Sequence, residues 1–251
     1  MNRYRPLLIA LGLIIFWQII VLITGVEHFI LPSPLQVAIA MVDRFNIIIG
    51  HAWFTLAEII LGLIFGTVLG TVSALFMGYF TLARQWLMPL LVISQAVPVF
   101  ALAPILVLWL GYGMVSKVAM ATLIIYFPVT AAFFDGLRRT ELGHLELAYT
   151  MGASRWSILR HIRIPAALPS FASGVRVATA VAPIGAIVGE WVGSSRGLGF
   201  LMLHANARLQ IDVMFAALFI LAVMAVLIYF SMDAVLRRLV SWQAETQPSN
   251  D

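Results

Sequence analysis

Uncharged apolar runs of about 20 residues recur along this sequence, and they restrict the folds open to it more than any other feature. Such a run matches the roughly 30 Å hydrocarbon thickness of a bilayer at about 1.5 Å per helical residue. Of 251 residues, 62% are hydrophobic and 10% charged. The runs are rich in Leu, Ile, Ala and Val without alternation, which favours helices over barrel strands. The sequence therefore predicts an all-α integral membrane protein.

Six stretches are apolar and long enough to cross a membrane, and together they predict one transmembrane domain over residues 1–251. The predicted spans are 7–25, 52–79, 86–110, 114–135, 166–190 and 212–236. The first exceeds the apolar region of a signal peptide and has no small-residue cleavage site, so we expect it to remain as a span. A shorter apolar stretch, 32–41, is expected to lie along the interface or to cap the bundle.

Basic residues are distributed unevenly between alternate loops. With the N-terminus inside, ten fall on the inner side and four on the outer. The inner set is Arg3, Arg5, Arg84, Arg138, Arg139, Arg155, Arg160, Arg163, Arg237 and Arg238. The outer set is Arg44, Lys117, Arg196 and Arg208. Because cytoplasmic loops are enriched in Lys and Arg, both termini and the segment 136–165 are predicted to be cytoplasmic.

Segment 136–165 carries helix signals although it is too polar to insert. Glu141 is expected in a first helical turn, Gly152 at a left-handed C-terminal cap, and Ser154 at the N-cap of a second helix that Pro165 ends. Apolar residues recur at helical spacing in both halves: Leu142, Leu145, Ala148, Tyr149, then Trp156, Leu159 and Ile162. We expect a helix-turn-helix with an apolar strip for docking into a partner. A basic loop kept for topology and lipid contact is the alternative.

The same segment resembles the EAA motif of ABC importer permeases, in which E-A-A, three residues, G, nine residues and I-x-L-P follow in order. Matching positions are Glu146, Ala148, Gly152, Ile162 and Pro165. Leu147 and Ile164 depart from the pattern, each apolar for apolar. The resemblance continues through PAALPSFASGVR and SSRGLGFLM, which are similar to the nitrate, sulfonate and taurine branch of these permeases.

This resemblance implies a type I importer permease in the bacterial cytoplasmic membrane, with segment 136–165 as the coupling helix. Its implied partners are two ABC ATPase subunits, a second permease copy, an extracytoplasmic solute-binding protein and membrane lipid. ATP and Mg²⁺ would bind the ATPase, and no cofactor would bind this chain. The stretch QAVPVFALAPILVLWLGYG resembles permeases for pyrimidine precursors of thiamine. Alkanesulfonate, taurine or nitrate is the alternative solute.

The residues needed for catalysis or metal binding are missing from the sequence. It has no cysteine, and its histidines show no metal-ligand spacing. Lys117, the sole lysine, is flanked by Ser116 and Val118 and is not part of a phosphate-binding G-x-x-x-x-G-K-[ST] loop. We therefore expect a non-catalytic transport subunit with no metal. Nucleic-acid binding is also unexpected, because aromatic residues are not interleaved with the charges.

Two sets of residues predict how the helices pack and where a solute passes. Small residues recur every fourth position in the second span, at Gly62, Gly66, Gly70, Ala74 and Gly78. That stripe predicts close packing against another helix, with a path-lining face as the alternative. The third and fifth spans contain helix-breaking residues, namely Pro98 and Pro104, then Pro183, Gly185 and Gly189. We expect kinks there bordering the translocation path, together with Gln95.

Three ionisable residues lie at or near spans, namely Glu58, Arg176 and Glu190. A charge at the bilayer centre costs about 2.5–3.5 kcal/mol, so each should be paired or face water. We expect an ion pair between Arg176 and Glu58; snorkelling of Arg176 or contact with the solute are the alternatives. Since few membrane-embedded relay groups are present, an autonomous secondary carrier or channel is the less favoured class of function.

Overall fold

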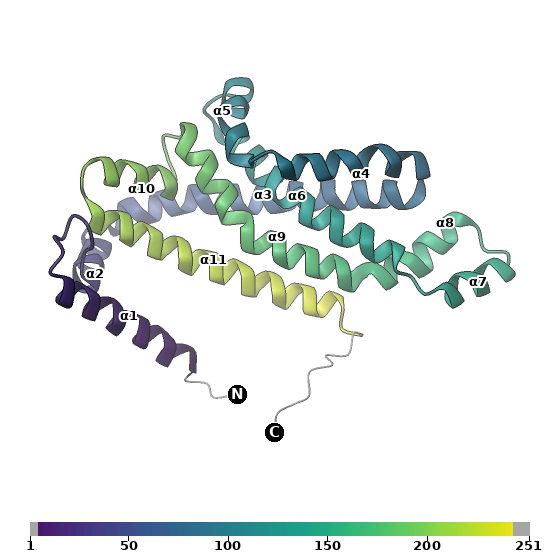
Figure 1. The fold of residues 1–251 in the computed structure, drawn as a ribbon, viewed down its shortest axis with the longest axis horizontal. Coiled ribbons are helices and arrows are strands. Elements are labelled where there is room, and N and C mark those ends of the chain that lie inside the picture. The colour runs from purple at the N-terminus through teal and green to yellow at the C-terminus, as the bar shows by residue number, and fades with distance from the viewer. Residues whose placement is uncertain (1–4, 243–251) are drawn as a thin grey trace.

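The computed structural model describes residues 5–242, and every regular element in that range is helical (Figure 1). Arg3, counted above on the inner side, lies outside the described residues. The elements, in chain order, are α1 (Arg5–Thr24), α2 (Pro34–Asp43), α3 (Phe45–Tyr79), α4 (Thr81–Ala96), α5 (Val99–Leu110), α6 (Met114–Arg138), α7 (Leu142–Thr150), α8 (Arg155–Ile158), the π-helical turn η1 (Leu159–Arg163), α9 (Ile164–Gly193), α10 (Leu198–Ala207) and α11 (Ile211–Leu239).

Long apolar helices dominate the bundle, which confirms the all-α, multi-span prediction. Within the described residues, four helical stretches are long and apolar enough to cross a membrane: α3, α6, α11, and α9 together with α8 and η1. The pair α4 and α5 forms a fifth, broken candidate. The helix α1 covers most of the first predicted span.

The third predicted span is wrong as a single kinked helix. Its two halves, α4 and α5, meet at 102°. Val97, which separates them, is extended at φ −84° and ψ 120°. The ring of Pro98 disfavours helical geometry in the preceding residue and provides no N–H for a helix bond. The chain therefore turns sharply at this point.

The helix α6 lies between α3 and α9, and small residues set the register of this layer. A Cβ on Gly62 of α3 would lie 2.5 Å from Cβ of Ala121 in α6, and a Cβ on Gly185 of α9 would lie 2.8 Å from the same residue's Cα. The predicted small-residue stripe thus faces α6. Gly66 approaches Ile125 in the same way. Residues 62, 121 and 185 are consequently level with one another in the bundle.

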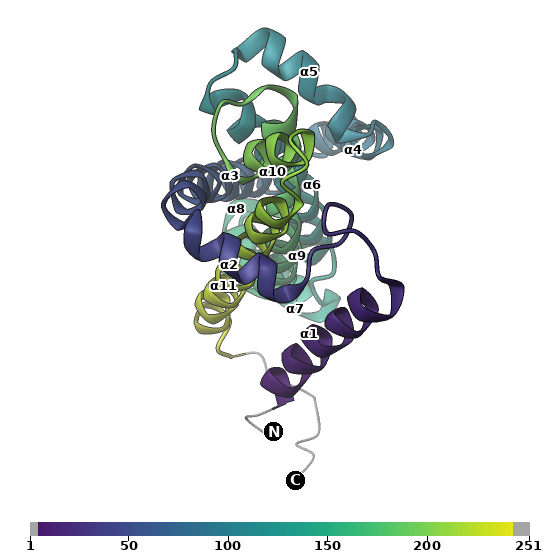
Figure 2. The same ribbon diagram turned by 90° about the vertical axis from the view of Figure 1, so that its left-hand side faces the viewer.

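The two ends of the bundle differ. Figure 2 faces the end that carries α2 and α10. There α2 packs on α11 through buried Val37 and Ala40, so the short helix expected at 32–41 caps the bundle. The opposite end carries α7 and α8, which project beyond the other helices (Figure 1). We call these the α10 end and the hairpin end.

Pro165 does not end the second helix of the hairpin, contrary to the sequence prediction. The helical path continues from α8 through η1 into α9. Pro165 lies just after η1 inside this continuous helical path, so it removes one backbone donor without ending the helix. The π-helical turn just before it accommodates the local change in winding. The hairpin is therefore joined to α9 without a loop.

Candidate functional site

The hairpin of α7 and α8, residues 142–158, is built around a glycine turn. Gly152 has φ +74°, the left-handed conformation predicted for it. The N–H of Ala153 donates to the carbonyl of Ala148 at 2.9 Å, which closes the end of α7. The hydroxyl of Ser154 accepts from the N–H of Ser157 at 3.2 Å and caps α8, also as predicted. These caps fix the angle between the two helices.

Glu141 differs slightly from its predicted place. It occupies the N-cap position of α7 rather than the first turn, and its side chain accepts no capping bond. Its carboxylate instead lies 3.4 Å from Nδ1 of His144. Since both side chains are largely exposed, this contact contributes little to stability.

Apolar side chains of the hairpin are exposed, and a groove runs beside them. The exposed set consists of Leu142, Leu147, Tyr149, Met151 and Trp156. The groove, of about 500 Å³, lies between α7 and the start of α9. Ala148 and Ile162 line it, whereas Glu146, Gly152 and Pro165 lie on the exposed surface nearby. This end of the molecule thus presents both apolar knobs and an apolar groove.

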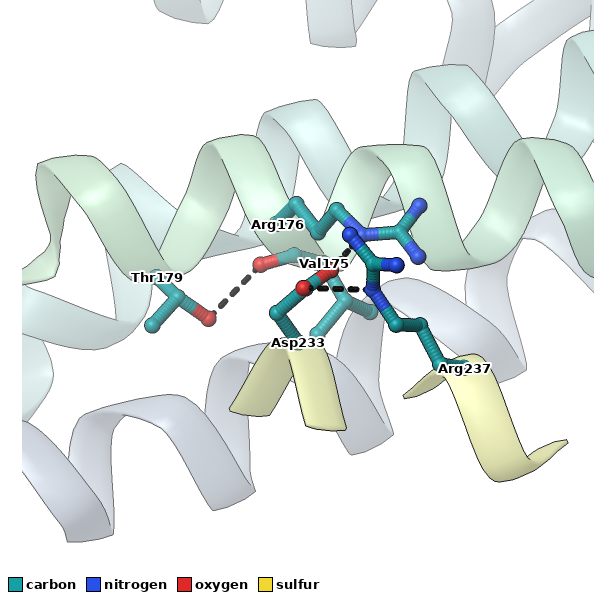
Figure 3. Close-up of polar contacts among 5 residues, drawn as sticks. All are labelled: Val175, Arg176, Thr179, Asp233 and Arg237. Carbon is teal, nitrogen blue, oxygen red and sulfur yellow. Dashed lines mark hydrogen bonds and ion pairs between the residues drawn. The ribbon is translucent and has the colours of Figure 1, made fainter. Parts of the chain in front are cut away.

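Arg176 is paired with Asp233 and not with Glu58, so the predicted partner is wrong. Nε of Arg176 donates to Oδ1 of Asp233 at 2.6 Å, which joins α9 to α11 (Figure 3). Nε of Arg237 donates to the other oxygen, Oδ2, at 2.8 Å. One carboxylate therefore holds two guanidinium groups.

The register of the bundle explains this correction. Glu58 lies about one helical turn from Gly62, and Glu190 about one turn from Gly185, both toward the α10 end. Since Gly62 and Gly185 are level, Glu58 is roughly level with Glu190, whereas Arg176 lies about four helical turns from Glu190. Asp233, which the sequence analysis missed, is level with Arg176. The sequence offers one signal for it: Asp233 is an acidic residue in the last span, close to the basic residues at the end of that helix.

A second polar cluster is buried near the α10 end. The hydroxyl of Thr55 donates to Oε1 of Glu190 at 2.6 Å, and the backbone N–H of Gly199 donates to Oε2. Nζ of Lys117 donates to the carbonyl of Tyr112 at 2.7 Å and to that of Gly193. Thr55, Glu190 and Lys117 are each at most 1% exposed. Lys117 thus lies inside the bundle, although it was counted as an outer-loop charge.

The residues predicted to border a path are not gathered in one place. Gln95, Pro98 and Pro104 are exposed along α4 and α5. Pro183 is buried within α9, which remains a single helix through it. The last turns of α9 lie against α5, where Gly193 approaches Tyr112 and Val107. Among the described residues, no group of three or more His, Asp or Glu is placed to hold a metal ion.

Sequence comparison identifies relatives over nearly the full length of the chain. It is 52% identical over 94% of its length to a probable ABC transporter permease protein of Haemophilus influenzae, 96% of which is covered. It is 38% identical over 95% of its length to a formylaminopyrimidine transport permease protein of Halalkalibacterium halodurans, again with 96% covered. A riboflavin transport system permease protein of Chloroflexus aurantiacus is 37% identical, with 92% of this chain and 87% of that protein covered.

The fold is shared with a solved transporter. A chain of the MetNI methionine ABC transporter, in an inward-facing conformation, matches 78% of this chain and 98% of its own length, with a TM-score of 0.67 at 21% identity. Residues 59–243 match the family described as binding-protein-dependent transport system inner membrane component. With that match and relatives at 52% and 38% identity, the chain belongs to this family, the non-catalytic permease subunits of ABC transporters.

Proposed function

We propose that the chain works in an ATP-driven importer and that its coupling segment, residues 136–165, receives force from a separate ATPase subunit. One observation carries the proposal: the helical path from Arg155 to Gly193 is continuous over 39 residues. At about 1.5 Å per residue it is a rod of about 58 Å. A displacement of the hairpin is therefore transmitted along α9 to the α10 end.

The hairpin provides a surface suited to a grooved protein partner. Exposed Met151 and Trp156 are apolar anchors of the kind that dock in hydrophobic clefts. Glu146, Ala148, Gly152, Ile162 and Pro165 form or border this surface and are the proposed coupling residues. Two ABC ATPase subunits would bind there, one for each permease copy, and ATP and Mg²⁺ would bind to them.

A second copy of this chain is proposed to complete the translocation path. In one copy, Gln95, Pro98 and Pro104 lie on the surface of α4 and α5 rather than in an enclosed channel. Large apolar side chains beside them, such as Leu108 and Trp109, are also exposed. A homodimer that brings these helices together would enclose the path. Pro183 and Arg176 would then support the helix that moves beside it.

We propose an orientation from the distribution of charge. The basic residues of segment 136–165 favour a cytoplasmic location for the hairpin end and for both termini. The α10 end then faces outward, where an extracytoplasmic solute-binding protein would deliver the solute. The membrane would be the bacterial cytoplasmic membrane.

For the solute, we propose a pyrimidine precursor of thiamine. The name of the relative from Halalkalibacterium halodurans, together with the sequence resemblance in α4 and α5, supports this choice. The relative named for riboflavin is almost as similar, which makes riboflavin a necessary competitor in any test. Alkanesulfonate, taurine and nitrate remain the alternatives from the sequence.

The test is uptake into proteoliposomes that contain the chain, its ATPase and its binding protein. We expect radiolabelled formylaminopyrimidine to accumulate only when ATP is supplied on the side of the membrane that carries the ATPase. Unlabelled formylaminopyrimidine should compete with this uptake, whereas riboflavin and taurine should not. If riboflavin or taurine competed and unlabelled formylaminopyrimidine did not, the proposed solute would be rejected, but the proposal of an ATP-driven importer would stand. Accumulation driven by an ion gradient, without the ATPase, would establish a secondary carrier and reject the importer.

A further inference from the structure

The buried cluster at the α10 end joins four elements that are far apart in sequence. Thr55 comes from α3, Lys117 from α6 and Glu190 from α9. The N–H of Leu198, at the start of α10, donates to the hydroxyl of Thr55 at 2.8 Å. The N–H of Gly197 donates to Nδ1 of His51 at 3.0 Å. The loop between α9 and α10 is thus held from α3 as well as from α9.

The hydrogen bonds around Glu190 suit an ionised carboxylate. Both of its oxygens accept hydrogen bonds, one from Thr55 and one from the N–H of Gly199. An ionised carboxylate accepts at both oxygens and has no hydrogen of its own to place. Lys117 supplies the opposite charge close by. A buried negative charge with donors on both oxygens and a cation nearby is well compensated.

Glu58 lies in the same cluster but lacks these donors. It is 3% exposed, and no N–H or O–H of the described residues donates to its buried Oε2. Its carboxyl group is within hydrogen-bonding reach of Glu190. Two ionised carboxylates repel at that distance and have no hydrogen to share, so one of the pair must carry a proton.

We propose that Glu58 and Glu190 form a buried proton-binding site, in which Glu58 holds the proton and donates it to Glu190, and that this pair fastens the loop 194–197 and the first turn of α10 to the bundle. With Glu58 neutral, the charges of Glu190 and Lys117 balance. With Glu58 ionised, the cluster would hold two adjacent anions against one cation. Repulsion between the two carboxylates would then displace Glu190 from the Thr55 hydroxyl and the Gly199 N–H, and so loosen the bonds that hold Gly199 and Leu198.

Three more titratable groups lie at this end of the bundle. His51 of α3 accepts the N–H of Gly197, and Arg196 of the loop and His204 of α10 lie near His51. A pocket of about 480 Å³, lined in part by His51 and Arg196, opens at this end. Its lining reaches His51 and Phe54 of α3, within about one helical turn of Thr55. Arg196 also lies over the ring of Phe54, 4.9 Å from its centroid.

The direct test is infrared spectroscopy of the chain in lipid nanodiscs at neutral pH, with the spectrum in D₂O subtracted from the spectrum in H₂O. We expect a C=O band of a protonated carboxyl group that shifts in D₂O and disappears in Glu58→Gln. The control Glu27→Gln changes an exposed carboxyl and should leave the band intact. A wild-type spectrum without such a band, or a band that survives Glu58→Gln, would overturn the proposal.

Amide hydrogen exchange tests the fastening role. Glu58→Gln replaces the protonated acid with a neutral group of the same shape, so Leu198 and Gly199 should remain as protected as in the wild type. Amide exchange rises with pH in any protein. In the wild type the exchange of these two amides should rise more steeply than that, because Glu58 can lose its proton; in Glu58→Gln it should not. In Glu190→Gln, which removes the acceptor charge, protection should fall by at least tenfold. Equal protection in Glu190→Gln, or an identical pH response in Glu58→Gln, would refute this role.

Discussion

Asp233 is a single side chain on which two helices depend. It accepts from Arg176 of α9 at 2.6 Å and from Arg237 of its own helix at 2.8 Å, and its side chain is 15% exposed. Hydrogen bonds between charged groups are shorter and stronger than neutral ones. In a bundle where most contacts are apolar, this pair of bonds specifies how α9 and α11 meet.

Replacing Asp233→Asn should therefore weaken the contact between α9 and α11. The amide keeps one acceptor but loses the charge, so we expect the free energy of unfolding to fall by about 1–2 kcal/mol. Asp43→Asn, at an exposed carboxylate, is the matched control and should change it by less than about 0.5 kcal/mol. Both are measured by thermal unfolding in detergent. An Asp233→Asn variant as stable as the wild type would show that this carboxylate does not hold α9 and α11 together.

Single residues were predictable from sequence where their chemistry is local. Gly152 and Ser154 cap their helices as expected, because a cap depends on neighbours only a few residues away. The partner of Arg176 was not predictable in this way. It depends on which helices adjoin and at which height, and the charge of Asp233 alone contains neither piece of information.

At the scale of elements, α3 and α6 approach closely because glycines remove side chains from their interface. A Cβ at Gly62 would lie 2.5 Å from Cβ of Ala121, which is fixed to its backbone and cannot rotate away. Without a hydrophobic driving force between helices in lipid, such close packing is a main source of association. The stripe is thus a requirement of this interface.

Gly62→Ala should force α3 and α6 apart. Overpacking of this kind costs about 1–3 kcal/mol and outweighs the roughly 1 kcal/mol that alanine gains over glycine in a helix. Gly50→Ala is the control in the same helix, because a Cβ there meets no atom within 4 Å. Thermal unfolding should show Gly62→Ala below the wild type and Gly50→Ala at or above it. The reverse order would show that the stripe is not tightly packed.

Proline has opposite effects in two elements of this chain. Pro98 follows an extended residue and separates α4 from α5 by 102°, whereas Pro165 lies in the first turn of α9 and interrupts nothing. The sequence predicts a perturbed helix at both places, since the ring always removes a donor. Whether that becomes a break depends on the surrounding backbone. At Pro165 the π-helical turn Leu159–Arg163 precedes the ring and the helix continues, whereas Val97 before Pro98 is extended.

For the whole molecule, composition was sufficient to predict an all-helical membrane bundle. It was not sufficient to predict how the helices pair, because nearly every face is apolar and no contrast marks the buried one. The layer of α3, α6 and α9, the broken pair α4 and α5, and the buried cluster around Glu190 all depend on that pairing. The hairpin was predictable because its sequence is polar and it projects beyond the other helices, so that polarity and helix caps are informative there.

The central claim is that the hairpin is cytoplasmic and is covered by an ATPase. Because the chain has no cysteine, Met151→Cys, at a position 77% exposed, provides a unique thiol on the hairpin. Ser195→Cys provides an exposed thiol at the α10 end with little change in shape.

The deciding measurement is labelling of these two thiols by a membrane-impermeant maleimide in vesicles of each orientation. The account predicts that the Met151→Cys thiol reacts only in inside-out vesicles and is protected when the ATPase is bound, while the Ser195→Cys thiol reacts only in right-side-out vesicles. Labelling of Met151→Cys from the outer face, or no protection by an ATPase that supports uptake, would contradict it.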